Sequence, residues 1–371
     1  MLSELFSCSN TNKGVAEQYS SFLIDSFKKE IPFENYSVRY TTVFFDKKNK
    51  TDYIYMLNTD RMLIHGYNLN KQQFDFTLNI PLKFDEQISY VVLDKDSLYF
   101  ISNPEDRKIC CVNSKGEITQ SWQITDSTKA YGKEYSISAF YSWPLMLDEK
   151  FIYTSYYPLY SLADTTNHKK YFTQPKIVVI SKNNGSIVNE IIHFPEKYIA
   201  NSYREYNLSC TMNSNNEIIV SFRGEDSVLL YNTKDKTYKY KLMMSSFFTM
   251  KNVYKEDTTM DHYASLTKYS VENSSYFSIQ YDKFRKKYYR VCLHKYKYDN
   301  DDGTVNTSGE RPWSIVVADS AFNIEKEIVF PRLKYNYGNI LITSKGVLVS
   351  KSNAYNKNYK QNELNYDIFI F

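Results

Sequence analysis

The sequence predicts an all-β protein folded as a six-bladed β-propeller of four-stranded antiparallel blades. Short apolar or alternating runs recur along its 371 residues with Asn, Asp, Ser, Gly and Lys between them, as in strands joined by tight turns. Aromatic residues make up 17% of the chain, including 36 Tyr and 23 Phe, and such enrichment favours strands. The runs form quartets that repeat about every 35–55 residues, which is the period of propeller blades.

Chain order gives five complete quartets and one incomplete quartet. The incomplete quartet, at the C-terminus, has three runs, so we expect an N-terminal segment, either 22–27 or 33–40, to supply its fourth strand and close the ring. The segment Met243–Ser275 is an alternative place for a degenerate seventh blade. The predicted strands are 41–45, 52–57, 62–69 and 74–80; 88–93, 97–102, 108–112 and 117–124; 145–147, 150–156, 176–181 and 186–192; 208–212, 217–222, 227–232 and 237–243; 276–282, 287–297, 313–320 and 323–330; and 338–344, 346–352 and 366–371.

The hairpin between the third and fourth runs recurs most clearly, as CVNSKGEI, VISKNNGSI, LYNTKDKTY and VADSAFNI. Its central residues supply the backbone geometry of tight turns. Antiparallel order places the links between second and third strands, and those between blades, on one face of the ring. The long links fall on that face, at Thr125–Pro144, Tyr156–Pro175, Pro195–Tyr206, Met243–Ser275, Tyr298–Pro312, Pro331–Gly338 and Ser352–Leu364.

The long links are rich in Tyr, whose ring gives a flat apolar surface together with a hydroxyl group. Long loops on a rigid scaffold often carry function. We therefore expect this face to bind a peptide, glycan or protein partner without transforming it. The alternative is that the rings pack inward under their own loops. The candidate binding residues are Trp143, Tyr156, Tyr157, Tyr160, Tyr203, Arg204, Tyr263 and Tyr335.

Composition and charge exclude several other classes of protein. The 46 basic and 42 acidic residues give a net charge of +4 spread along the chain, so no basic tail points to nucleic acid. No run of about 18 apolar residues is present to cross a bilayer. The cysteines lack the paired spacing of a zinc site and are too sparse for a disulfide scaffold, so we expect Cys110, Cys111, Cys210 and Cys292 to pack reduced in strands.

Sequence motifs for catalysis or cofactor binding are absent. The chain has no HExxH, GxSxG, P-loop or GxGxxG pattern, so we expect no cofactor. Asp261 with His262, or Asp164 with His168, would make acid–base pairs, but neither spacing is diagnostic.

One segment begins like a calcium-binding loop. Asp299 and Asp301 open it and Glu310 stands at its twelfth position, but Gly303 is fifth where the turn requires a sixth-position glycine. A solvated loop is the plainer interpretation, and Asp299, Asp301 and Glu310 are weak metal candidates.

The start of the chain resembles a bacterial lipobox, with Leu5, two small or apolar residues and then Cys8. Together with the YNL, VNSKGE and YNTKDK hairpins and the closing DIFIF strand, it makes the chain similar to the TolB-like six-bladed propeller lipoproteins of Bacteroidetes. That resemblance implies an exported protein, periplasmic or on the cell surface, anchored by a lipid at Cys8, and it brings no catalytic residues. The signal is incomplete in this chain, because Met1–Ser7 is shorter than a secretory leader and Glu4 interrupts it.

Residues 1–14 are therefore expected to form a tether and residues 15–371 a single monomeric propeller that contacts the membrane only through Cys8. Two alternatives remain for its function: a propeller-type glycan hydrolase or lyase with acids at the channel mouth, and an architectural scaffold in a cell-envelope complex. Converging acids and a His would favour the enzyme, and a broad flat apolar patch would favour the scaffold. A cytosolic protein in which Cys8 is incidental is a further alternative.

Overall fold

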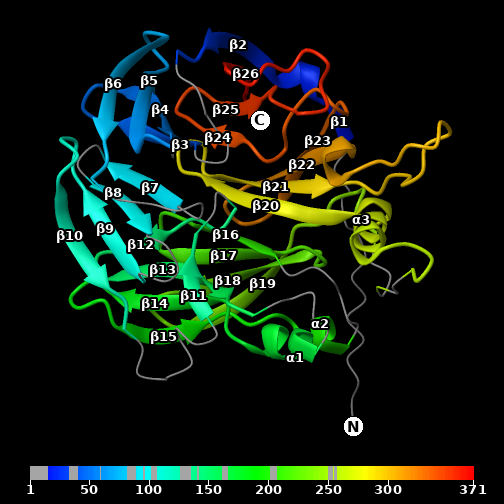
Figure 1. The fold of residues 1–371 in the computed structure, drawn as a ribbon, viewed down its shortest axis with the longest axis horizontal. Coiled ribbons are helices and arrows are strands. Elements are labelled where there is room, and N and C mark those ends of the chain that lie inside the picture. Colours follow the sequence, from blue (N-terminus) through cyan, green and yellow to red (C-terminus); the bar gives the residue numbers. More distant parts are fainter. Residues whose placement is uncertain are drawn as a thin grey trace.

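The computed structural model is a ring of six antiparallel β-sheets, which confirms the six-bladed propeller (Figure 1). We number the blades I to VI in chain order, starting from the sheet that contains residue 41. Among the described residues, no helix is both long and apolar enough to span a membrane. The structure describes residues 16–32, 41–58, 60–81, 89–94, 97–101, 107–125, 135–139, 142–160, 166–200, 207–249, 254 and 257–371.

Blades I and II follow the predicted quartets, and blade III has a divided first strand. The strands of blade I are β3 (Thr41–Asp46), β4 (Thr51–Asn58), β5 (Leu63–Asn68) and β6 (Gln73–Asn79). Those of blade II are β7 (Ser89–Asp94), β8 (Ser97–Ile101), β9 (Lys108–Val112) and β10 (Ile118–Gln123). Those of blade III are β11 (Tyr135–Ser138), β12 (Met146–Leu147), β13 (Phe151–Pro158), β14 (Ile177–Ser181) and β15 (Ile187–Ile191).

Blades IV to VI complete the ring. The strands of blade IV are β16 (Leu208–Met212), β17 (Glu217–Phe222), β18 (Ser227–Asn232) and β19 (Thr237–Leu242). Those of blade V are β20 (Ser275–Asp282), β21 (Lys287–Leu293), β22 (Trp313–Ala318) and β23 (Ile324–Phe330), with β1 (Ala16–Gln18) beside β23. Those of blade VI are β24 (Ile340–Ile342), β25 (Val347–Ser350), β26 (Glu363–Phe369) and β2 (Leu23–Glu30).

The N-terminal strand β2 closes the ring. It pairs antiparallel with β26 from Leu23 opposite Phe369 to Glu30 opposite Glu363. This confirms the first of the two predicted closing segments, and the second, 33–40, lies outside the described residues. The segment Met243–Ser275 contains the helix α3 (His262–Glu272), and the ring has six blades.

The inner strand of blade III corrects one prediction. Residues 135–138, which the sequence analysis placed in a long loop, form β11 and pair with β13, while Met146–Leu147 pairs with the other half of β13. The intervening segment turns toward blade IV, where the carbonyl of Ser142 accepts hydrogen bonds from the backbone N–H of Cys210 and the hydroxyl of Ser209. The strand is divided because this insertion packs on the next blade.

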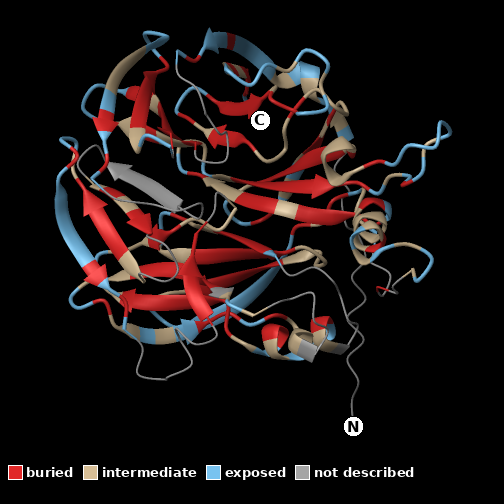
Figure 2. Ribbon diagram, in the orientation of Figure 1, coloured by how far each residue is buried: buried red, intermediate tan, exposed pale blue. Residues whose placement is uncertain are grey.

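The hydrophobic core lies between the blades. Within the described part of the chain, six clusters of buried side chains occur, one at each blade–blade interface. A central strand therefore buries both faces, as β22 does along its whole length, and its sequence is almost continuously apolar. The outer strands β2 and β10 are largely exposed (Figure 2).

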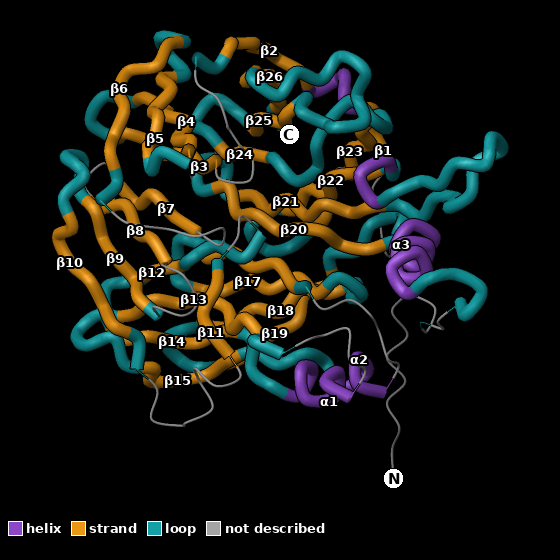
Figure 3. The backbone as a smooth tube through the Cα atoms, viewed as in Figure 1, coloured by secondary structure: helices purple, strands orange, loops and turns teal. Residues whose placement is uncertain are grey.

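Strand order gives the ring two different faces. Short turns join first to second and third to fourth strands, and we call their side the turn face; the other links form the loop face. The helices α1 (Thr166–Thr173), α2 (Glu196–Ala200) and α3 belong to the loop face, and they lie on the same side of the ring (Figure 3). The 3-10 helices are η1 (Tyr19–Phe22) and η3 (Ser308–Glu310). The long links on the loop face are 159–176, 192–207, 243–274, 294–312, 331–339 and 351–362.

Candidate functional site

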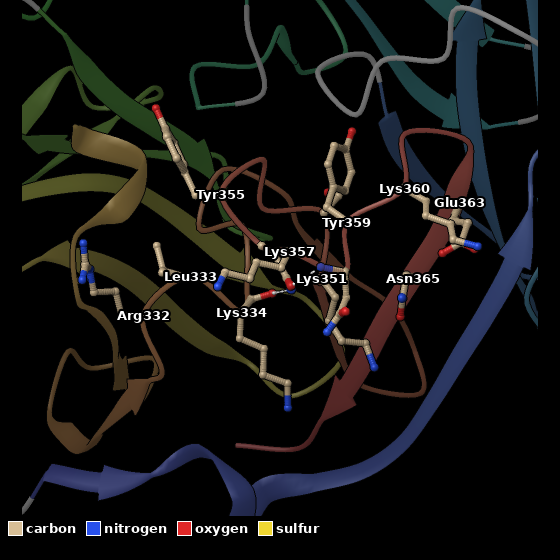
Figure 4. Close-up of a pocket in the computed structure, with 13 residues that line it drawn as sticks. Arg332, Leu333, Lys334, Lys351, Tyr355, Lys357, Tyr359, Lys360, Glu363 and Asn365 are labelled. Atoms are coloured by element: carbon tan, nitrogen blue, oxygen red, sulfur yellow. Dashed lines mark hydrogen bonds and ion pairs between the residues drawn. The ribbon is translucent and has the colours of Figure 1, made fainter. Parts of the chain in front are cut away.

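A pocket of about 540 Å³ lies on the loop face, between the links 331–339 and 351–362. Its volume falls within the range of small-molecule sites. Tyr355 and Tyr359 stand apart on its two sides, with Arg332 toward Tyr355 and Lys360 and Glu363 toward Tyr359 (Figure 4). The cations that line it are Arg332, Lys334, Lys351, Lys357 and Lys360.

A buried carboxylate beneath the pocket positions two of these cations. Asp367 of β26 is 3% exposed, and its Oδ1 accepts a hydrogen bond of 2.5 Å from Lys351 Nζ. Its Oδ2 accepts one of 2.5 Å from the hydroxyl of Tyr335 and lies 3.9 Å from Lys334 Nζ. Burial and then the hydrogen bond to Asp367 raise the pKa of Tyr335, so the phenol stays protonated and donates. The floor of the pocket is therefore preorganised.

The wall at Tyr355 is tied to a third link, 294–312. Thr307 Oγ1 donates to the hydroxyl of Tyr355 over 2.7 Å, and the ring covers Gly309 so closely that a Cβ there would lie 2.6 Å from a ring carbon. Arg332 Nη2 donates to Asn306 Oδ1 over 2.5 Å. Three links thus brace one another around the pocket.

The opposite wall carries the more accessible charges. Glu363 forms ion pairs with Lys28 at 3.0 Å and with Lys360 at 3.6 Å. Lys357 is exposed and has no ion-pair partner in the described part of the chain. Glu363 is the carboxylate among the lining residues, against five cations, so the pocket favours an anionic ligand.

The structure places the candidate binding residues in several separate environments. Tyr335 is fully buried under the pocket and does not contribute to an open surface. Tyr156 is 7% exposed, and its hydroxyl donates to Glu190 at the interface of blades II and III. The hydroxyl of Tyr160 lies 2.7 Å from that of Tyr135 in the same region.

Two further candidates remain on or near the surface. Trp143 is partly buried against the core between blades III and IV, and Tyr263, on α3, is 75% exposed. Tyr203, Arg204, the side chain of Tyr157 and the lipidation candidate Cys8 lie outside the described residues.

Most described aromatic rings of the links around α1 and α2 pack inward. Tyr171, Phe172, Phe194 and Tyr198 are each 5% exposed or less and contact one another, with ring centroids of Phe194 and Tyr198 4.9 Å apart. They extend the core between blades III and IV. The inward-packing alternative therefore describes these loops, because each covers the otherwise open end of a blade interface.

The calcium-loop residues do not converge. Asp301 is 99% exposed at its side chain and pairs with Lys297 at 3.2 Å. Glu310 instead caps η3, where its carboxylate accepts from the backbone N–H of Thr307 over 2.9 Å. Asp299 forms an isolated backbone bridge with Val305. Within the residues that the structure describes, no group of three or more His, Cys, Asp or Glu side chains could hold a metal ion.

Of the residues suggested as acid–base pairs, Asp261 has a structural role. Asp261 is the N-cap of α3, and its carboxylate accepts from the backbone N–H of Tyr263 and Ala264. His168 lies in α1, and Asp164 is outside the described residues. The four cysteines predicted in strands are buried there and unpaired: Cys110, Cys111, Cys210 and Cys292.

Sequence reasoning missed the residues that line the pocket, although it placed their links on the loop face. A usable signal was present in AYNKNYKQ, residues 354–361, where Tyr and Lys alternate with Asn. Lys334 and Lys351 gave no local signal, because Asp367 brings them together from different links.

Comparison with protein families identifies the chain. Residues 18–329 match the family described as Domain of unknown function (DUF4221). The chain belongs to the DUF4221 family. A DUF4221 member from Bacteroides vulgatus has a crystal structure with a TM-score of 0.76 and 18% identity, covering 94% of this chain and 97% of that one. No curated protein matches this DUF4221 chain.

A second solved structure has the same ring architecture at lower similarity. It is a Bacteroides fragilis protein whose name describes it as exported, with a TM-score of 0.56 and 9% identity, covering 97% of this chain and 98% of that one. At these identities both likenesses establish the fold of the DUF4221 protein, and its function must be argued from its own residues.

Proposed function

We propose that this DUF4221 protein is a non-catalytic recognition protein that binds an acidic glycan in the loop-face pocket. The observation that carries the proposal is the pocket of about 540 Å³ lined by five cations and one carboxylate. Two of the cations are held by buried Asp367, so the site does not have to order them when a ligand arrives.

The polar character of the lining favours a sugar over a peptide. Asn356, Asn358 and Asn365 offer amide groups, and Leu333 supplies the aliphatic surface. Amides suit ligand hydroxyls, and a Tyr ring can stack on the apolar face of a sugar. A peptide would ordinarily use apolar side-chain pockets or a free strand edge, whereas this pocket is lined chiefly by the links 331–339 and 351–362.

Isothermal titration with oligogalacturonate tests the proposal, with the fully methyl-esterified oligomer as a matched neutral ligand. We expect the acid to bind and the ester to bind weakly or not at all. Lys357→Glu should weaken binding of the acid by about tenfold or more, because it replaces attraction with repulsion. Lys234→Glu, on the turn face, is the matched control and should leave the affinity unchanged. Equal binding of acid and ester would contradict the proposal.

Tyr355→Ala separates stacking from charge. We expect it to weaken binding of oligogalacturonate, because the variant removes the ring face on which the sugar would stack. Tyr263→Ala, an exposed ring on α3, is the control and should have no effect. Tight binding of a polyglutamate peptide at the same site, with no binding of the sugar, would show that the ligand is a peptide.

We also propose that the protein is exported and carries a lipid at Cys8, like the TolB-like lipoproteins it resembles. The lipobox-like LFSC and the exported name of the Bacteroides fragilis neighbour support this. Metabolic labelling with an alkyne fatty acid, in a bacterial host that processes lipoproteins and from the gene with its native upstream sequence, should label the protein. Cys8→Ser should abolish the label. Labelling that survives this substitution would contradict acylation at Cys8.

A further inference from the structure

Six exposed lysines gather on the turn face, on the other side of the ring from the pocket. They belong to the turns 47–50, 283–286 and 343–346, and none has an ion-pair partner among the described residues. Partial desolvation is the larger cause of the lowered pKa of Lys283, and the nearby charge of Lys47 is the smaller cause. We call this set the turn-lysine patch: Lys47, Lys48, Lys50, Lys283, Lys286 and Lys345.

The three turns lie together although they are far apart in sequence. The rings of Phe45 and Phe284 meet edge to face at a centroid distance of 5.1 Å, which joins blades I and V. Arg285 Nη2 donates to the carbonyl of Thr343 over 2.8 Å, which joins blades V and VI. Figure 1 shows β3, β20 and β24 meeting in the same region. The patch is therefore continuous across three neighbouring blades.

The carboxylates beside the patch are already occupied. Asp52 and Asp282 are both fully buried. Asp52 accepts from the hydroxyl of Ser344 over 2.6 Å, and Asp282 binds Arg285 Nε at 2.6 Å. Asp46 accepts backbone hydrogen bonds within its own turn. These acids hold the turns in place. Lys345 Nζ donates to the carbonyl of Leu69 over 3.3 Å, but the charges of the six lysines are not neutralised by an ion pair within the described residues.

We propose that the turn-lysine patch lies against an anionic lipid bilayer surface. The cations of these three turns that are free of ion pairs within the described residues are all lysines, since Arg285 binds Asp282. The compact charge of lysine suits a diffuse negative potential, whereas arginine forks suit bidentate recognition of a defined group. Clusters of four to eight basic residues bind anionic lipid surfaces in this way. Phe45 and Phe284 lie partly exposed in the middle of the patch, where aromatic rings can enter the interface.

The course of the N-terminal strand agrees with this orientation. β1 runs parallel to β23, and β23 runs from the turn 319–323 on the turn face to the link 331–339 on the loop face. β1 therefore also points from the turn side toward the loop face. With that face on the bilayer, the pocket points away from the membrane. The proposal rests on the lysines and does not require acylation of Cys8.

Co-sedimentation of the full chain with vesicles tests the proposal, using Cys8→Ser throughout so that no lipid anchor contributes. We expect binding to phosphatidylcholine vesicles that contain phosphatidylglycerol, loss of binding to phosphatidylcholine alone, and a steep decrease with added salt. Each lysine near the surface contributes up to about fivefold in partitioning. The triple variant Lys47→Gln, Lys48→Gln, Lys50→Gln should therefore weaken vesicle binding by about 100-fold.

The controls separate the patch from general charge and from the pocket. The triple variant Lys169→Gln, Lys197→Gln, Lys295→Gln removes equal charge from exposed positions of the loop face and should keep most of the binding. Lys357→Glu should leave vesicle binding intact even where it abolishes glycan binding. Equal losses in the two triple variants would overturn the proposal. Vesicle binding that does not depend on phosphatidylglycerol would also overturn the proposal. Tighter binding to soluble polyglutamate than to vesicles at equal charge would do the same.

Discussion

Replacement of Lys176 by Met should change how the stability of the protein depends on pH. Lys176 is 3% exposed beneath α1, where its Nζ donates to the backbone carbonyl of Tyr171 and lies 3.5 Å from the centroid of that ring. Burial lowers the pKa of Lys176 to about 7. This ammonium is enclosed by the inward-packed aromatic rings of the loop face, so its titration reports whether that packing exists.

The direction in which the free energy of unfolding changes with pH follows from the folded-state and unfolded-state pKa values of Lys176. The folded-state pKa of about 7 lies below the ordinary value of 10.5, so the unfolded state binds more protons between them. The free energy of unfolding therefore rises with pH through this window. Below the window, the destabilisation caused by burying the charged lysine is fully present. From about pH 7 to about pH 10 the rise amounts to about 3.5 kcal/mol. The cation–π contact with Tyr171 stabilises the charged form and acts against this change.

Urea unfolding at a series of pH values measures the effect. Lys176→Met keeps most of the apolar stem and removes the titrating group. We expect the variant to exceed the wild type in stability near pH 7, with an advantage that shrinks by about 3.5 kcal/mol toward pH 10. Lys169→Met, on the exposed side of α1, is the control and should follow the wild-type profile. Parallel profiles for Lys176→Met and the wild type would refute the buried environment of this lysine.

Three further substitutions test other contacts of the fold, each by urea unfolding. Glu327→Gln should destabilise by about 3 kcal/mol, because buried Glu327 accepts charge-assisted hydrogen bonds that include one of 2.5 Å from the hydroxyl of Ser314; an unchanged midpoint would contradict this network. Tyr335→Phe should lower the free energy of unfolding by about 1–3 kcal/mol and weaken oligogalacturonate binding, since Asp367 loses a hydrogen-bond donor. Phe27→Ala should cost about 3–5 kcal/mol by opening the closing blade, and a cost below about 1 kcal/mol would show that β2 does not close the ring.

The blade pattern could be predicted because it is a local property of the chain. Every central strand packs between two neighbouring blades, so the run Ile177–Ile180 in β14 is apolar throughout and β22 is interrupted only by Ser314, and turn residues mark their ends. The missing fourth strand of the last quartet predicted an N-terminal closing segment, and the structure selects 22–27 from the two candidates. The inner strand Tyr135–Ser138 escaped prediction because its continuation is displaced by contacts with blade IV that the local pattern does not contain.

The direction of side chains in the long links could not be predicted. Tyr335 and Tyr355 both stand in polar loop sequence, yet Tyr335 is fully buried and Tyr355 is 45% exposed. The difference comes from a neighbouring strand, since Asp367 offers an acceptor beneath Tyr335. Burial in a loop is therefore decided by residues distant in sequence. Composition could not locate the turn-lysine patch either, because blade order brings its three turns together.

A crystal structure of the protein with bound oligogalacturonate tests the central claim most directly. The account predicts a sugar between Tyr355 and Tyr359, with a ligand carboxylate within hydrogen-bonding distance of Lys351 or Lys357. Sugar density elsewhere on the ring, or an empty pocket when the ligand is shown to be bound in solution, would contradict it.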